Sequence, residues 1–290
     1  MAISRLRFIV PGNGTYFLDL AKALSLQERK LHRQKMIYTC YGGYMKDQDG
    51  SIMHMNTAPN TWPVKRAVNR GFSLWRKMIS RTLRDMEGAG TGSYSDFKVF
   101  LNNGMGSGVL NPVDASDNEL FDIGPEWDYS TLTSEDPDGP GGTPPDQFDL
   151  QIVGPHSGAD PNWTRIGLLQ SWVNSRAIPD SAHPDLPADF ATDPLNNLFD
   201  AGDVQDDRLL ILASEGDAAP YDEDTMFGNA AAAGASNNLQ RVSSSQTSAA
   251  NPIAPVMGFQ AICGLVQIVV SGTDTAGEIV LDVETNGVKF

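Results

Sequence analysis

Five basic residues between positions 66 and 84 are spaced so that they could contact a row of phosphates. At 100° per residue, Arg66, Arg70, Lys77, Arg81 and Arg84 fall within an arc of about 60° around a helix. Such side chains neutralise phosphate charge and release counterions without reading base sequence. The spacing therefore predicts non-specific contact with a nucleic-acid backbone. An ordinary solvated face of a helix is the alternative.

Apolar residues occupy the other side of the same helical plot. They are Val68, Phe72, Trp75, Ile79, Leu83 and Met86, within about 80° of one another. We therefore expect an amphipathic helix over this stretch, with a cationic outer stripe.

A second basic segment, from about residue 16 to residue 34, has the same pattern. Phe17, Leu20, Ala21, Leu24 and Leu31 share one face, which Glu28 interrupts. Lys22, Arg29, Lys30 and Arg33 lie opposite, and Arg5 and Arg7 precede the segment. These six residues and the five of the later helix are the predicted nucleic-acid-binding residues. Nearby, Trp62, Trp75, Tyr38 and Tyr41 could stack on unpaired bases, although the place of Trp75 on the apolar stripe favours core packing.

Charge is distributed unevenly along the 290 residues. The first 84 positions hold 15 of the 21 Lys and Arg residues but only 4 of the 36 Asp and Glu residues. This division predicts two electrical environments, one facing a polyanion and one facing solvent.

Motifs for catalysis are absent from the sequence. It contains no G-x-S-x-G elbow, no phosphate-binding P-loop and no H-E-x-x-H pair. The four histidines, His32, His54, His156 and His183, are isolated from one another. We therefore predict that the protein is not an enzyme.

Two groups of carboxylates offer the oxygen ligands that calcium prefers. One comprises Glu135, Asp136, Asp138 and Asp146, and the other Asp200, Asp203, Asp206 and Asp207. Neither has EF-hand spacing, so no motif supports a calcium site. No metal-ligating residue and no cofactor are predicted, and a solvated acidic surface is the simpler interpretation.

Short apolar runs between turn-forming residues indicate a mainly β protein with long loops. The candidate strands are Met36 to Tyr44, Phe97 to Leu101, Phe148 to Val153, Ile166 to Val173, Phe259 to Val270 and Glu278 to Glu284. One elaborated domain fits the length. The longest apolar run, Val256 to Val270, is too short to cross a membrane, so no membrane insertion is expected. No secretory signal is recognisable, and the two cysteines, Cys40 and Cys263, are expected to be core thiols.

Six strings occur in an order that resembles the capsid proteins of small circular Rep-encoding single-stranded DNA viruses. They are LSLQERKLHRQ (24 to 34), NTWPVKRAVNRGFSLWRKM (60 to 78), SDFKVFLN (95 to 102), DPLNNLFDAGD (193 to 203), APYDED (219 to 224) and AICGLVQI (261 to 268). The resemblance covers the chain from about Tyr16 onward, although no single string is a formal signature.

The resemblance implies a single jelly-roll β-sandwich of two antiparallel sheets, with long loops and a few helical insertions. Together with the helical pattern and positive charge of the early residues, this divides the chain into residues 1–35, a basic, helical, inward-facing segment, and residues 36–290, the shell domain. Many copies would assemble inside the host cell into an icosahedral virion shell around single-stranded DNA, and the host receptor is unknown. Capsid proteins of this group often begin with an Arg-rich arm, whereas only Arg5 and Arg7 occur before the first patterned segment here.

A jelly-roll module that binds a carbohydrate or a receptor without forming a shell is the alternative function. It would use an aromatic-lined loop site, for which Trp127, Trp163 and Trp172 are the candidates.

Overall fold

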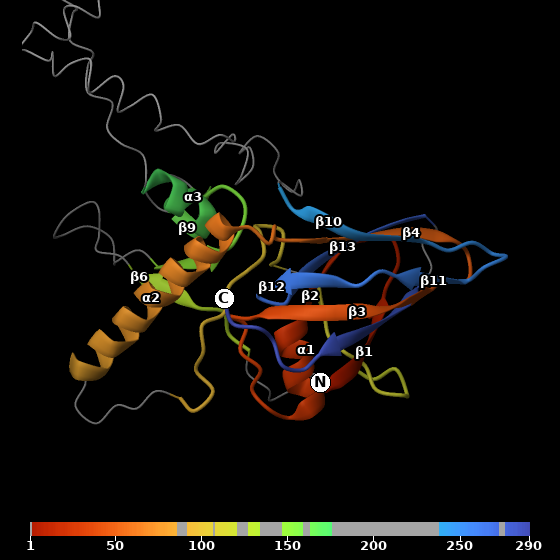
Figure 1. The fold of residues 1–290 in the computed structure, drawn as a ribbon, viewed down its shortest axis with the longest axis horizontal. Coiled ribbons are helices and arrows are strands. Elements are labelled where there is room, and N and C mark those ends of the chain that lie inside the picture. The colour runs from red at the N-terminus through yellow and green to blue at the C-terminus, as the bar shows by residue number, and fades with distance from the viewer. Residues whose placement is uncertain are drawn as a thin grey trace, which may run out of the picture.

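The computed structural model describes residues 2–85, 92–106, 108–120, 127–133, 147–158, 163–175, 238–272 and 276–290. Within these ranges the protein is mainly β (Figure 1). The helices are α1 (Leu20–Glu28), α2 (Trp62–Asp85) and α3 (Leu168–Asn174).

The first sheet runs in the order β1-β14-β3-β11, with β12 also paired to β3. Its strands are β1 (Ile3–Val10), β14 (Gly277–Glu284), β3 (Ile37–Lys46), β11 (Ile253–Val256) and β12 (Phe259–Ile262). Strand β1 has a two-residue alternation: Leu6, Phe8 and Val10 are buried, while Arg5 lies exposed and Arg7 is half-buried on the other side.

The second sheet runs in the order β10-β4-β13-β2-β5. Its strands are β10 (Gln240–Gln246), β4 (Ser51–Thr57), β13 (Leu265–Gly272), β2 (Gly14–Asp19) and β5 (Val109–Leu110). Both sheets contribute to one hydrophobic core, in which Phe8 and Leu281 of the first sheet join Met55 and Ile268 of the second. Burial of these apolar side chains between the sheets is the main term that stabilises the pair.

Strand pairing in these two sheets is nested along the chain. Strand β1 pairs with β14, β2 with β13, β3 with β12 and β11, and β4 with β10, all antiparallel. The successive pairs alternate between the first and the second sheet. The chain therefore pairs as one long antiparallel hairpin whose two arms cross repeatedly from sheet to sheet.

Residues 58–239, called the insertion below, separate β4 from β10 at the turn of this hairpin. The insertion contains α2, α3, β5 and a third sheet of order β6-β7-β9-β8. The strands of the third sheet are β6 (Thr131–Thr133), β7 (Gln147–Gln151), β9 (Trp163–Gly167) and β8 (Ser157–Gly158). Helices α2 and α3 lie with the third sheet at one end of the first two sheets (Figure 1), over a second core that includes Val68, Phe97 and Leu169.

Several predicted elements are confirmed. The long amphipathic helix is α2, and strands occur at the predicted positions in β3, β7 and β14. The run from Phe259 to Val270 is two strands, because Cys263 and Gly264 have φ values of 57° and 68° and form a turn between them. Both cysteines are buried free thiols, as predicted.

Other predictions are wrong. The strand expected from Ile166 to Val173 ends at Gly167 and continues as α3, because an apolar run alone does not separate a buried strand from a buried helix. Residues Phe97 to Leu101 form no strand, although Phe100 makes an isolated bridge to Gln151.

The helical expectation for residues 1–35 holds only over α1. Strands β1 and β2 occupy most of residues 3–19. They pair with β14 and β13, so these residues belong to the first and second sheets and not to a separate helical segment. Asp19 determines where the helix begins, since its side chain accepts a hydrogen bond from the Lys22 amide as the N-cap. Arg29, at φ 53°, ends it in the left-handed conformation.

Candidate nucleic-acid interface

Helix α2 buries one side against the second core and exposes the other. Pro63 stands in its first turn, where a missing amide hydrogen costs nothing. Val64, Ala67 and Val68 are at most 1% exposed. A Cβ on Gly71 would lie 2.7 Å from the Leu168 side chain, so this glycine allows α2 to approach α3 closely.

Beyond Gly71, aromatic rings anchor the helix. The ring centroids of Phe72 and Trp75 lie 5.7 Å and 5.9 Å from that of Phe97. Past Trp75 the apolar side chains are only half-buried, and in Figure 1 the later turns of α2 extend away from the first two sheets. Met86 lies outside the described residues.

The predicted cationic stripe lies on the outer side of α2. Arg66, Arg70, Lys77, Arg81 and Arg84 are all exposed. Arg70 donates a hydrogen bond to Ser175 Oγ at 2.7 Å, and Arg84 donates to the Ser80 carbonyl at 3.3 Å. Within the described ranges, none of the five has a carboxylate within 4.0 Å. Their charge is therefore not neutralised by ion pairs to these parts of the chain.

Arg5 and Arg7 differ from the stripe because they are ion-paired. The Arg5 guanidinium makes two hydrogen bonds to Asp282, at 2.7 Å and 2.9 Å, and these hold the pKa of Asp282 below its usual range. Arg7 contacts Glu278 and Asp117, both at 2.6 Å. Both arginines lie on β1, and we expect them to contribute less to phosphate binding than the stripe.

The remaining predicted residues gather around the end of α1. Arg29, Lys30 and Arg33 are exposed, and Lys22 is half-buried. Burial lowers the pKa of Lys22, and the charge of Asp19 opposes this shift. Glu28, which interrupts the apolar face, is exposed and contacts His32 at 3.0 Å.

A buried carboxylate fixes this region to a distant part of the chain. Asp19 is 1% exposed, and its Oδ2 accepts hydrogen bonds from Gln34 Nε2 and Trp127 Nε1, each at 3.0 Å, and from the Tyr129 hydroxyl at 3.5 Å. Burial raises the pKa of Asp19, and hydrogen bonds including those from Lys22, Trp127 and Gln34 oppose the shift. Asp19 therefore positions residues 127–129 beside α1.

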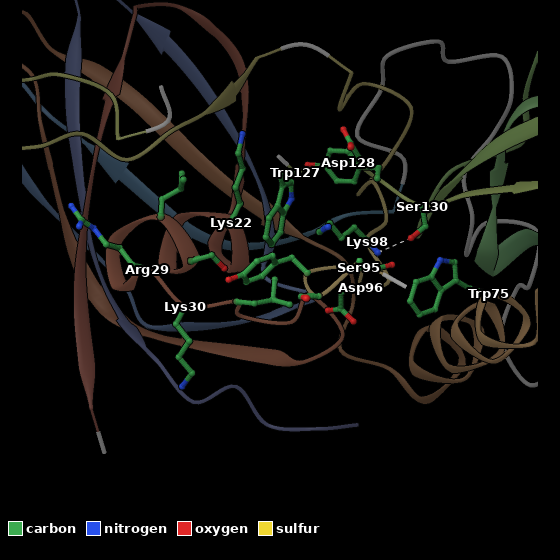
Figure 2. Close-up of a pocket in the computed structure, with 17 residues that line it drawn as sticks. Lys22, Arg29, Lys30, Trp75, Ser95, Asp96, Lys98, Trp127, Asp128 and Ser130 are labelled. Carbon is green, nitrogen blue, oxygen red and sulfur yellow. Dashed lines mark hydrogen bonds between the residues drawn. The ribbon is translucent and has the colours of Figure 1, made fainter. Parts of the chain in front are cut away.

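Between these elements lies a cavity of about 730 Å³, called the α1 cavity below. Figure 2 shows α1 with Lys22, Arg29 and Lys30 on one side and Trp75 of α2 on the other. Lysine and arginine side chains in its lining are Lys22, Arg29, Lys30 and Lys98. The aromatic lining residues are Trp75, Tyr94, Trp127 and Tyr129, and the carboxylates are Asp96 and Asp128.

The α1 cavity contains three charged residues that the sequence did not single out, Asp96, Lys98 and Asp128. Lys98 is 7% exposed, and its ammonium nitrogen lies 4.8 Å from the centroid of the Trp127 ring. Asp96 Oδ2 is buried without a hydrogen-bond partner in the described part of the chain. Burial raises the pKa of Asp96, against the effects of the Phe97 amide, Arg33 and Lys98. The sequence could have identified Asp96 and Lys98 by their alternation with the apolar residues Phe97 and Val99, which places both on one side of an extended segment.

A second hollow, of about 430 Å³, adjoins the α1 cavity. Trp75 and Ser95 line both, and the second hollow continues along α2 past Arg76 and Arg84. The structure thus brings together two basic segments that the sequence treats as separate helices.

The other stacking candidates have different surroundings. Tyr38 is fully buried, with its hydroxyl donating to the Arg33 carbonyl at 2.7 Å, so it cannot stack on a base. Tyr41 is 48% exposed on β3, and Trp62 is 53% exposed and meets Trp172 edge to face. Trp75 packs partly in the core, as predicted, and also borders both hollows.

The histidines remain separate where they can be located. His32 contacts Glu28, His54 contacts Ser244, and His156 lies edge-on to Trp163, while His183 lies outside the described residues. No group of three or more potential metal ligands occurs in the ranges that are described, and both predicted acidic groups lie outside those ranges. Among the described helices, none is long and apolar enough to cross a membrane.

Comparison with known proteins gives no relative: no protein-family model, curated protein or solved structure matches the chain.

Proposed function

We propose that this protein is a viral capsid protein that assembles through contacts between many identical copies into an icosahedral shell around single-stranded DNA. In this proposal it is structural and not catalytic, it acts in the virion, and it contacts DNA without reading its sequence. The observation that carries the proposal is the nested pairing of β1 with β14, β2 with β13, β3 with β12 and β4 with β10.

Nested pairing of this kind supports a jelly roll. A jelly roll is two Greek keys in two facing sheets, and viral capsid proteins are among the proteins built on it. Eight strand positions alternate between two sheets here, if β11 and β12 are counted as one interrupted strand. The fold alone does not imply a function, because lectins and cupins share it.

The distribution of charge supports a role inside a shell. The insertion carries α2, which exposes a cationic stripe without carboxylate partners in the described ranges. Most of the acidic residues lie later in the sequence. In the proposed shell the α2 surface faces the packaged DNA, and an excess of negative charge outside keeps particles from adhering to one another.

Imaging of the purified full-length protein tests the proposal. After nuclease treatment and size-exclusion chromatography, we expect closed particles of uniform diameter in negative stain, with a mass of at least sixty copies by light scattering. Protein that stays monomeric at high concentration, with and without single-stranded DNA, would refute the shell.

A carbohydrate- or receptor-binding jelly-roll module is the second candidate function. The observation in its favour is the α1 cavity, where Trp127 and Tyr94 are lining residues. The other two tryptophans predicted for a carbohydrate site are less suited to binding a sugar. Trp172 is only 8% exposed, and the ring centroid of Trp163 lies 5.4 Å from that of His156. A glycan array separates the two functions: specific binding by a small oligomer favours the module.

A further inference from the structure

We infer that the α1 cavity binds one unpaired nucleotide of a single nucleic-acid strand, whose neighbouring phosphates then follow α2. The inference rests on the proposed contact with single-stranded DNA and identifies where a base is held. It adds Tyr94, Asp96, Lys98 and Trp127 to the residues that would contact the strand.

The size and lining of the α1 cavity suit a nucleotide. Its volume of about 730 Å³ lies within the usual range for sites that bind small molecules, about 300 to 1,000 Å³. Tyr94 is 74% exposed at its wall and offers a ring for base stacking. Trp127 lies deeper, where its indole nitrogen is held by Asp19.

The polar groups of the cavity point to a ligand that both donates and accepts hydrogen bonds. A buried carboxylate oxygen needs a donor, and an ammonium group needs acceptors. In the described part of the chain, Asp96 Oδ2 is buried and accepts no hydrogen bond, and Lys98 Nζ lies 4.8 Å from the centroid of the Trp127 ring. The edge of a nucleobase carries donors and acceptors side by side, so one base can satisfy both groups.

Charge favours a nucleotide over a simple anion and over a neutral sugar. Four basic residues and two carboxylates line the cavity. The two carboxylates would repel a small anion bound beside them. A neutral sugar would leave the net positive charge of the lining without a counter-charge. Arg29 and Lys30, both exposed at the rim, are placed to hold the phosphate outside.

The neighbouring hollow gives the strand a continuation. Trp75 and Ser95 border both spaces, and Arg76 and Arg84 lie along the second. A strand with one base in the α1 cavity can therefore pass directly onto the basic helix. Stacked bases and a basic groove are the usual combination in proteins that bind single strands without sequence preference.

The test measures binding of fluorescein-labelled (dT)₈ to the nucleic-acid-free full-length protein by fluorescence anisotropy. Tyr94→Ala removes the exposed ring, and Met257→Ala is the control, since Met257 is 66% exposed and lies outside the cavity. We expect Tyr94→Ala to weaken binding at least about fivefold, from the usual value of base stacking on an aromatic ring. We expect Met257→Ala to leave the affinity unchanged.

Two further variants address Asp96 and Lys98. Asp96→Asn and Lys98→Met keep the size of each side chain while removing its charge, and each should weaken (dT)₈ binding. Circular dichroism and the unfolding midpoint show whether both variants are folded. If either is unfolded, Tyr94→Ala still tests the inference, because Tyr94 is exposed. Equal affinity of the wild type and Tyr94→Ala for (dT)₈ overturns the inference, as does tighter binding of an eight-base-pair duplex or competition by neutral chitohexaose.

The inference and the proposed function can fail separately. If particles form and Tyr94→Ala binds (dT)₈ as tightly as the wild type does, the proposed shell stands and the nucleotide site is refuted. If the protein forms no particles and Tyr94→Ala weakens (dT)₈ binding, the nucleotide site stands and the proposed shell is refuted.

Discussion

Replacing three cations of α2 should make DNA binding less sensitive to salt. The variant Arg70→Gln/Lys77→Gln/Arg81→Gln removes three exposed charges that have no carboxylate partner in the described ranges, and leaves the buried face of the helix unchanged. Each phosphate contact to a single strand contributes about 0.7 to the slope of log affinity against log salt. If all three residues contact phosphate, the slope becomes shallower by about 2.

That slope change is large enough to measure. Between 50 mM and 200 mM salt, a slope difference of about 2 means that the wild type loses about 20-fold more affinity than the variant. Anisotropy titrations with a labelled (dT)₃₀ at four salt concentrations give both slopes. The nucleic-acid content of purified particles, read from the ratio of absorbance at 260 and 280 nm, should fall in parallel.

Arg5→Gln is the matched control for this experiment. Arg5 is also exposed, but its guanidinium is held by Asp282 through two hydrogen bonds. We expect the control to keep the wild-type slope. An unchanged slope and an unchanged nucleic-acid content in the triple variant would refute the role of α2. Impaired assembly with an unchanged slope would assign these residues to salt bridges with a neighbouring subunit.

Three further predictions concern stability and pH. Gly43→Ala should lower the free energy of unfolding by more than about 3 kcal/mol, because a Cβ there would collide with the backbone carbonyl of Val280 across the β3–β14 pair. Asp19→Ala should lower it by about 3 kcal/mol, because buried donors lose their acceptor. Asp282 should add stability that is present above the ordinary pKa of aspartate and is lost as pH falls through its lowered folded pKa.

Urea unfolding followed by tryptophan fluorescence measures all three. Gly106→Ala is the control for Gly43→Ala, since nothing lies within 4 Å of the added Cβ, and a similar loss in both would refute the collision. For Asp19, a loss below about 1 kcal/mol would mean that its donors find other partners. For Asp282, Arg5→Gln should flatten the acid limb of the stability curve, and an unchanged limb would contradict the prediction.

The sequence predicted those elements whose pattern is long and local. Helix α2 has a clear 3.6-residue period over more than five turns, so its cationic and apolar sides were placed correctly. Strand β1 was missed because its outward positions hold Arg5 and Arg7 and suggested a basic segment instead of a strand. Residues 14–19 were assigned to a helix because nothing local revealed their pairing with β13.

The α1 cavity could not be predicted because its parts are far apart in sequence. It is built by α1, residues 92–98, residues 127–130 and a single residue of α2, Trp75. Asp19, one isolated acidic residue in a basic segment, brings Trp127 and Tyr129 beside α1. Hydrogen bonds across more than a hundred residues leave no periodic signal, so the positions of Lys98 and Asp96 beside this wall had to come from the structure.

Nested pairing also determines when the two sheets can form during synthesis. Strand β1 and its partner β14 lie roughly 270 residues apart. At about 5 to 20 residues per second, a ribosome needs about 15 to 50 s to make the intervening chain. Until then β1 lacks its partner, and the first sheet cannot be completed on a partial chain. In the proposed shell, the surface that other copies recognise would therefore be complete only after β14 has been made, which delays assembly until then.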